Sequence, residues 1–390
     1  MDGPREVARR VRSTLSVVPL LAVVGLLGCA TARVGAAGEV RVLLYEGAGP
    51  IVVGAVGQSQ QVRIAAGGLV VDGQPSGERW SPRGAAPWQV GRRRVWGTIS
   101  VRAESGQIQV LNRVDLEAYV ASTVGGEMSA DWPQEALRAQ AVAARTYVLH
   151  EAGKRTGSFW DVRATTASQV YRGLAAESDS TRAAARATRG EVLTHGGEPI
   201  LAVFHSTAGG RTATAGEVWG QDLPYLRVVE VEEEDDAPHT YWRKEFESEA
   251  LGRVLAAAGF DIGTVRTLRV AQRTGSGRVE QLDVQGGADR TASLRGRALR
   301  RLVSSLALRS RLFEVKATEG GFAFVGSGFG HGVGMSQWGA RAMAERGEPY
   351  QRILARFYPG TRLERWSFRH TAASGPRSDR ARGRAQGEVQ

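Results

Sequence analysis

The chain has 390 residues, of which 42% are hydrophobic and 23% charged, a globular composition that is long enough for two or three domains. Its formal net charge of +11 and its pI near 10.4 favour an anionic partner. No arginine–aromatic stripe, zinc finger or helix-turn-helix pattern accompanies this charge, so the sequence does not indicate a nucleic-acid-binding protein.

The N-terminal segment, residues 1–29, is typical of an export signal. An arginine-rich start precedes an apolar run from Leu15 to Leu27, which is too short to span a membrane as a mature helix. Gly28 then precedes Cys29, the only cysteine, as at a lipoprotein processing site. We expect a lipidated Cys29 that anchors the mature protein to a membrane, and no disulfide. The alternative is an ordinary signal that is cut near residues 36–37, with Cys29 lost.

A small, mostly β domain is predicted for residues 39–112. Short runs rich in β-branched residues alternate there with glycine, which is the pattern of strands and turns. The expected strands are Val40–Leu44, Ile51–Val56, Gln61–Ile64, Leu69–Val71, Val95–Val101 and Ile108–Leu111.

A mixed α/β domain with a binding groove is predicted for residues 113–368, which makes the whole fold α+β. The acidic run Glu232–Asp236 is expected to be a solvated loop, and residues 369–390 a disordered basic tail. The expected helices are Asp115–Ala121, one after Pro133, Ser178–Arg189, Phe246–Ala258 and Leu294–Leu302. The expected strands are Val192–Thr194 and Ile200–His205, with hairpins of Val265–Gln272 and Val279–Gln285 and of Phe313–Ala317 and Phe322–Val325.

The segment GGEMSADWPQEALRAQAVAARTYVL, residues 125–149, holds a candidate acid. Glu127 lies between a Gly-Gly pair, expected to form a bend, and an alanine-rich helix whose first turn suits Pro133. Four alanines of that helix leave room for close packing. By local pattern alone, Glu127 more simply complements the positive end of the helix, worth roughly 0.3–1 kcal/mol. Asp131 is expected to cap or charge the same helix start.

Two later blocks combine glycine with polar residues. In FHSTAGGRTATAGEVWGQDLPYL, residues 204–226, Ser206 and the paired glycines suit either a ligand or a tight turn. In GFGHGVGMSQWGARAMAERGEPYQRILARFYPGT, residues 328–361, the glycines fit neither dinucleotide nor P-loop spacing. We expect this second loop to present His331, followed by a helix from about Val333 that carries Gln337 and Trp338. A buried structural histidine is the usual alternative for His331.

The three blocks, in this order and spacing, span residues 113–365 and resemble the stage II sporulation protein D and amidase-enhancer family of cell-wall proteins. The resemblance implies a peptidoglycan lytic transglycosylase with Glu127 as general acid/base and glycan strands as substrate. Anionic wall polymers would also suit the net charge, and no cofactor is expected. The residues expected to hold the glycan or support the acid are Gln140, Arg145, Tyr171, Ser206, His331 and Gln337.

Related proteins can carry cysteines and a histidine within Asp161–Gly173 that suggest a zinc site. The corresponding positions here are Arg163, Ala167 and Ser168, none of which is a zinc ligand. We therefore expect no metal there and a loop that is held by packing alone. Nor does a short ligand spacing join Glu127 to the histidines.

A lytic transglycosylase needs one carboxyl group where most glycosidases use two, because the 6-hydroxyl of the sugar is the nucleophile. Burial should raise the pKa of that acid toward neutrality. Two alternatives remain. In place of a transglycosylase, the chain could be a non-catalytic glycan-binding module that enhances a cell-wall amidase, or a hydrolase that uses Glu127 with Asp131 or Asp161.

Overall fold

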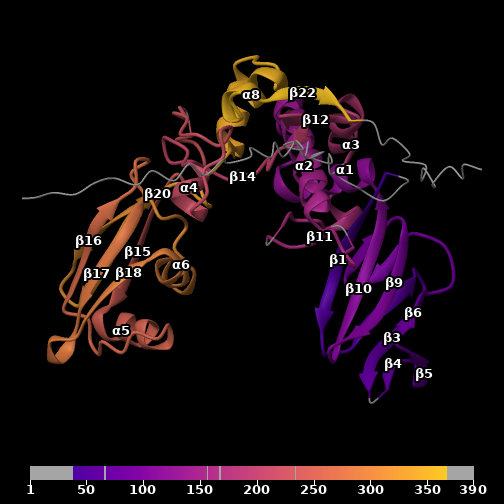
Figure 1. Ribbon diagram of the computed structural model, residues 1–390, viewed down its shortest axis with the longest axis horizontal. Helices are drawn as coiled ribbons and strands as arrows, with labels where there is room; N and C mark the ends of the chain where they lie inside the picture. Colours follow the sequence, from indigo (N-terminus) through magenta and orange to yellow (C-terminus); the bar gives the residue numbers. More distant parts are fainter. Residues whose placement is uncertain (1–37, 66, 156, 167, 233, 367–390) are drawn as a thin grey trace, which may run out of the picture. The chain divides into compact units, whose positions relative to one another are not determined.

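The computed structural model describes residues 38–65, 67–155, 157–166, 168–232 and 234–366. The predicted export signal, Cys29 and the predicted basic tail lie outside these ranges. Within them the chain combines helices with several sheets, and its N-terminal part is mostly β (Figure 1). The predicted α+β class is confirmed.

The N-terminal strands form two sheets, ordered β11-β1-β10-β9-β6 and β5-β4-β3-β2-β7-β8. Gly97 divides the predicted strand Val95–Val101: its φ is +86°, and a Cβ there would lie 1.9 Å from the carbonyl oxygen of Arg113. The sequence also missed β5, β6 and β7. The strands are β1 (Glu39–Gly47), β2 (Ile51–Ala55), β3 (Gln58–Ala65), β4 (Gly68–Val71), β5 (Gln74–Gly77), β6 (Arg79–Trp80), β7 (Trp88–Val90), β8 (Arg93–Val95), β9 (Thr98–Glu104), β10 (Gln107–Asp115) and β11 (Val162–Arg163).

Three helices follow, α1 (Leu116–Glu127), α2 (Gln134–Lys154) and α3 (Asp179–Ala187), with the short 3-10 turn Gly173–Ala176 before α3. Helix α2 contacts α1, α3 and β12 (Glu191–His195). The alanines expected to permit close packing are fully buried, which confirms that expectation; they are Ala136, Ala139, Ala143 and Ala144.

A buried ion pair fastens α2 to α1. The Arg145 guanidinium is fully buried and forms two hydrogen bonds to the Glu117 carboxylate, one of them 3.0 Å from Nε to Oε1. It also donates to the carbonyl oxygens of Ala185 and Glu191, at 3.2 and 3.1 Å. One side chain therefore links α1, α2, α3 and β12.

The second and third sequence blocks meet in a short parallel pair, β14 (Phe204–His205) with β21 (Met335–Ser336). The predicted strand Ile200–His205 is shortened to β14, and the helix expected from Val333 begins only at Gln337. That helix is α7 (Gln337–Glu345), and Ser336 is its N-cap. The remaining elements of this part are β13 (Glu198–Pro199), α4 (Ala215–Trp219), α8 (Tyr350–Phe357) and β22 (Arg362–Arg365).

A second hydrophobic cluster, drawn from residues 242–324, has its own core. It contains the sheets β15-β20-β19 and β16-β17-β18, including both predicted hairpins. The two predicted helices begin later than expected, because strands occupy their first residues. The elements are β15 (Tyr241–Glu247), α5 (Ser248–Ala257), β16 (Thr267–Arg273), β17 (Val279–Gln285), the 3-10 turn Gly287–Asp289, β18 (Thr291–Arg295), α6 (Gly296–Ser305), β19 (Phe313–Ala317) and β20 (Gly321–Ser327). None of the helices in the described ranges has the length and apolar character needed to cross a bilayer.

The Arg145→Ala variant should lose about 3–5 kcal/mol of unfolding free energy, because it leaves the Glu117 carboxylate partly buried without its cation. Arg138→Ala is the matched control on the same helix, since its pair with Glu135 is partly exposed and worth about 1 kcal/mol or less. Urea unfolding of both variants measures the difference. Equal losses would contradict the role given to Arg145.

Candidate functional site

Glu127 is the last residue of α1, and Gly125 and Gly126 lie inside that helix. The predicted Gly-Gly bend is therefore wrong. The glycines are needed for close approach instead: a Cβ on Gly125 would lie 1.9 Å from the carbonyl oxygen of Ala176, and one on Gly126 would lie 2.2 Å from that of Val170. The end of α1 thus packs directly against the backbone of residues 170–176.

This placement changes the electrostatics expected for Glu127. Helix α2 begins only at Gln134, so Glu127 does not complement its positive end; it lies at the negative end of α1, which disfavours its carboxylate. The cap predicted for Asp131 is also wrong. Asp131 is exposed, and the N-cap of α2 is Pro133, without any side-chain cap.

The Glu127 carboxyl group is half-buried and held by two hydrogen bonds. Its Oε1 accepts from the backbone N–H of Val170 at 2.7 Å, and the Gln337 side chain provides the other bond. Burial raises the pKa of Glu127, although both bonds and the nearby Arg172 favour the charged form. This is the direction that a general acid requires.

Two glutamines belong to the hydrogen-bonded cluster around Glu127. Gln337 is the first residue of α7, and its Nε2 donates to Oε1 of Gln140 on α2 at 3.5 Å. Both glutamines are buried. The structure therefore brings Gln140 and Gln337 together with Glu127, as supports of the acid rather than as exposed ligand contacts.

An aromatic pair flanks this cluster. Trp132 and Trp338 are half-buried and meet edge to face with ring centroids 5.0 Å apart, and the guanidinium of Arg341 lies over both rings. The backbone N–H of Trp338 donates to the carbonyl oxygen of Ser206 at 3.1 Å. Ser206, itself half-buried, therefore adjoins the start of α7.

His331 lies on the glycine-rich loop beside two other rings. It is half-buried, with ring centroids 5.5 Å from His205 and 5.3 Å from Trp219. Its Nδ1 accepts from the backbone N–H of Val333 at 3.0 Å. Burial lowers the pKa of His331 to about 4, so the ring is neutral at physiological pH.

Two predicted site residues are too buried to contact a glycan. The guanidinium of Arg145 is fully buried and already bound to Glu117, as described above. Tyr171 is also buried: its ring stacks on Tyr119 at 5.3 Å, and its hydroxyl donates to Oδ1 of Asn112 at 3.0 Å. A direct role for either in glycan binding is wrong for this structure.

Glu234 was not recognised from the sequence as a site residue. The acidic run was predicted to be solvated, but Glu234 is only 4% exposed, so that prediction is wrong at this position. Its carboxylate accepts from the backbone N–H groups of Ala208 and Gly209, both at 2.8 Å, and from the hydroxyl of Ser336. An acidic run gives no local signal of such burial.

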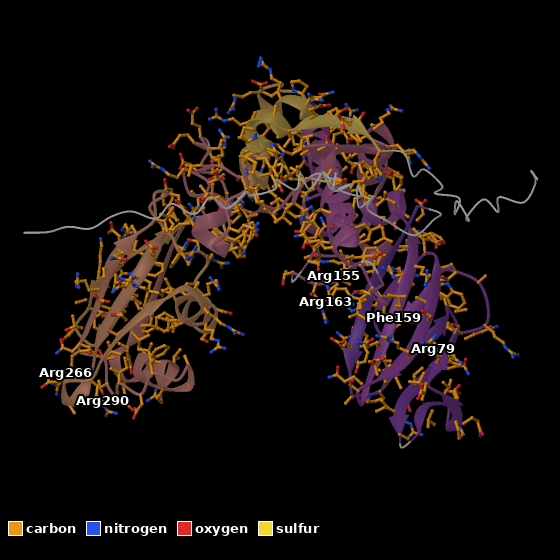
Figure 2. The ribbon with its side chains drawn as sticks, viewed as in Figure 1. Arg79, Arg155, Phe159, Arg163, Arg266 and Arg290 are labelled. Atoms are coloured by element: carbon orange, nitrogen blue, oxygen red, sulfur yellow. The ribbon has the colours of Figure 1, made fainter. Side chains whose placement is uncertain are left out.

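The loop that was expected to be held by packing alone is held by charge as well. Asp161 is 1% exposed and accepts from the backbone N and the Nε of Arg41, at 2.8 and 3.1 Å. Arg163 forms an ion pair with Glu46 at 2.8 Å. Guanidinium groups also cover the neighbouring aromatic rings, Arg102 over Phe159 and both Arg155 and Arg163 over Trp160. Arg155, Phe159 and Arg163 are labelled in Figure 2.

The residues of this loop do not suit zinc. The backbone N–H of Arg163 donates to the Ser168 hydroxyl at 3.2 Å, and neither side chain is a usual zinc ligand. Ala167 lies outside the described residues. Across the part of the chain that the structure describes, no three His, Cys, Asp or Glu residues come together as a metal site.

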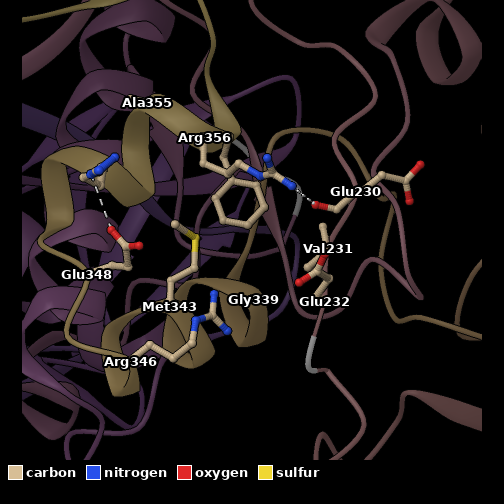
Figure 3. A pocket seen from close by; sticks show the side chains of 11 residues that line it. Glu230, Val231, Glu232, Gly339, Met343, Arg346, Glu348, Ala355 and Arg356 are labelled. Carbon is tan, nitrogen blue, oxygen red and sulfur yellow. Dashed lines mark hydrogen bonds and ion pairs between the residues drawn. The ribbon is translucent and has the colours of Figure 1, made fainter.

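A separate cavity of about 500 Å³ lies between α7, α8 and residues 230–232 (Figure 3). Phe357 and Met343 contribute to its wall, and glutamates and arginines surround them. Arg356 donates to the carbonyl oxygen of Glu230 at 2.8 Å. None of Glu127, Gln140 and Gln337 lines this cavity, so it is distinct from the candidate site.

Two protein-family models match parts of the chain. A family model described as "Stage II sporulation protein" matches residues 104–195, the stretch that contains α1 to α3 and Glu127. A second model, a domain of unknown function (DUF8618), matches residues 225–334, which include the second hydrophobic cluster.

Curated relatives identify the family. The chain is 33% identical to stage II sporulation protein D of Bacillus amyloliquefaciens over 64% of this chain and 74% of that protein. It is 32% identical to stage II sporulation protein D of Bacillus subtilis, over 65% and 76%. It is also 29% identical to the amidase enhancer of Bacillus subtilis, over 62% of this chain and 39% of that protein. The chain belongs to the stage II sporulation protein D family.

Replacing Glu127 by Gln should alter the pH dependence of stability in a defined direction. The folded-state pKa of Glu127 is raised, so its contribution is fully present below the unfolded pKa and is lost as pH rises through the folded one. Relative to the variant, the wild type should therefore lose stability on raising the pH above about 4.3, by about 1.4 kcal/mol per unit of pKa elevation.

Urea unfolding across pH 3–8 measures this difference, with Asp131→Asn as the exposed-carboxyl control. A wild type that instead gains stability relative to Glu127→Gln as the pH rises would show that the pKa of Glu127 is not raised.

Proposed function

We propose that the protein is a peptidoglycan lytic transglycosylase that cleaves the MurNAc–GlcNAc β-1,4 bond of glycan strands and leaves 1,6-anhydro ends. The family and its named relatives support a role related to the cell wall. The observation that carries the finer proposal is Glu127, a half-buried acid with a raised pKa, held by the Val170 N–H and Gln337.

In the proposed reaction, protonated Glu127 donates its proton to the glycosidic oxygen as the C1–O bond breaks. The resulting carboxylate then removes the proton from the 6-hydroxyl of the same MurNAc, and O6 bonds to C1. The acid is regenerated and no water is consumed. Val170 and Gln337 stabilise the carboxylate between the two steps, while burial favours the proton at rest.

The hydrolase alternative requires a second carboxylate. Asp161 does not suit this role, because it is buried and its oxygens are occupied by Arg41. Asp131 is exposed and remains the candidate for that alternative. A hydrolase would add water across the bond and leave free reducing ends.

The other rival is a non-catalytic glycan-binding module that enhances a cell-wall amidase, in line with the name of one relative. If this chain is such a module, Trp132, Trp338 and Ser206 would matter for glycan binding, and Glu127 would be replaceable. A cell-wall amidase would then be a partner of the chain.

The test uses the purified full chain on glycan strands with and without stem peptides, with mass spectrometry of the products. Anhydro-ended fragments from wild type and Asp131→Asn, and their loss by at least about 10²-fold in folded Glu127→Gln, are expected. Products that gain water and depend on Asp131 would establish the hydrolase. Retained glycan binding without any cleavage would overturn the enzymatic proposal in favour of the binding module.

We further propose that the protein is exported and anchored in the cell envelope by lipidated Cys29, on the strength of the N-terminal sequence pattern. Cells that express the wild type should incorporate radiolabelled palmitate into it, and cells that express Cys29→Ser should not. Equal labelling of the two proteins, or labelling of neither, would contradict the proposed lipid anchor at Cys29.

A further inference from the structure

We infer that Glu234 is a positioning residue for the Glu127 site: its buried carboxylate fixes the start of α7 and thereby sets Gln337 against Glu127. The inference deepens the proposed function and rests on it for the role of Glu127. It concerns a residue that would not touch the substrate.

The carboxylate of Glu234 occupies an anion-binding site that backbone N–H groups of the protein form. Three successive backbone N–H groups point to it, those of Ala208 and Gly209 at 2.8 Å and that of Gly210 at 3.4 Å. The φ angles of Gly209 and Gly210 are +72° and +99°, which favour glycine. Successive N–H groups in such a turn form an anion-binding concavity.

The guanidinium of Arg278, which contacts the same turn, is also buried. Arg278 donates from Nη2 to the carbonyl oxygens of Ala208 and Arg211, at 2.9 and 3.1 Å. It therefore holds the carbonyl side of the same turn whose N–H groups bind Glu234. The turn that follows Ser206 is fixed from both sides.

The link to the acid runs through Ser336. Its hydroxyl has one proton, which it donates to Oε1 of Glu234, and its oxygen accepts from the backbone N–H of Gly339 at 3.2 Å as the N-cap of α7. Donation to Glu234 leaves the oxygen lone pairs free for Gly339. The next residue along the chain is Gln337, which binds Glu127 and Gln140.

The two roles open to Glu234, plain stabilisation of the fold and positioning of the acid, differ in one measurable quantity, the pKa of Glu127. Removing the negative charge of Glu234 cannot by itself raise that pKa, because the loss of a negative charge favours the carboxylate. Losing the Gln337 hydrogen bond would raise it. The titratable and charged groups that face Glu127 are Arg172 and Tyr119, and neither changes in this comparison.

The experiment titrates ¹³C-carboxyl-labelled glutamate in the full chain by NMR, with the Glu127 signal assigned by its absence in Glu127→Gln. Glu234→Gln and Ser336→Ala should each raise the pKa of Glu127, as should Gln337→Met. Combining Glu234→Gln with Gln337→Met should give no further shift. Asp236→Asn, an exposed acid of the same run, is the matched control and should raise nothing.

A lower melting temperature with an unchanged or lowered pKa of Glu127 would make Glu234 a structural residue only and overturn the inference. A rise of equal size in Asp236→Asn would overturn it too. If Glu234→Gln does not fold, Ser336→Ala, which changes no charge, decides in the same way. The titration needs no cleavage, so its result is independent of whether the transglycosylase proposal survives.

Discussion

The contact on which the site depends is the close approach of the end of α1 to the backbone of residues 170–176. Gly125 and Gly126 make this approach possible, because any side chain there would collide with carbonyl oxygens. The same approach delivers the Val170 N–H to Glu127 at 2.7 Å. The same contact therefore determines both the packing of α1 and the orientation of Glu127. The buried alanines of α2 allow that helix to pack closely beside α1.

Burial moves the titrating groups of this region toward their neutral forms. It raises the pKa of Glu127 and lowers that of His331 to about 4. A raised pKa is the direction that a proton-donating carboxyl group needs, so burial of Glu127 agrees with the role proposed for it. The hydrogen bonds from the Val170 N–H and from Gln337 favour the carboxylate and so partly oppose the effect of burial on the pKa of Glu127.

The sequence predicted what local pattern controls and missed what distant partners control. Alternating β-branched runs located β1 to β4 and both hairpins of the second cluster, because strand periodicity is local. The start of α7 was misplaced, since it depends on the cap made by Ser336. The roles of Arg145 and Glu234 depend on partners 28 and 102 residues away, Glu117 and Ser336, and no local pattern reveals such pairs.

The alternating glycines of the third block have a packing explanation. A Cβ on Gly330 would lie 2.9 Å from Cβ of His205, one on Gly332 2.2 Å from the Arg278 guanidinium, and one on Gly334 2.1 Å from the carbonyl oxygen of Val203. At each of these three positions a Cβ would come too close to another part of the protein. The glycines serve the protein's own contacts rather than a ligand, so ligand contacts from this loop must come from the residues between them. Of these, Val333 is buried, which leaves Phe329, 37% exposed, and the half-buried, neutral His331.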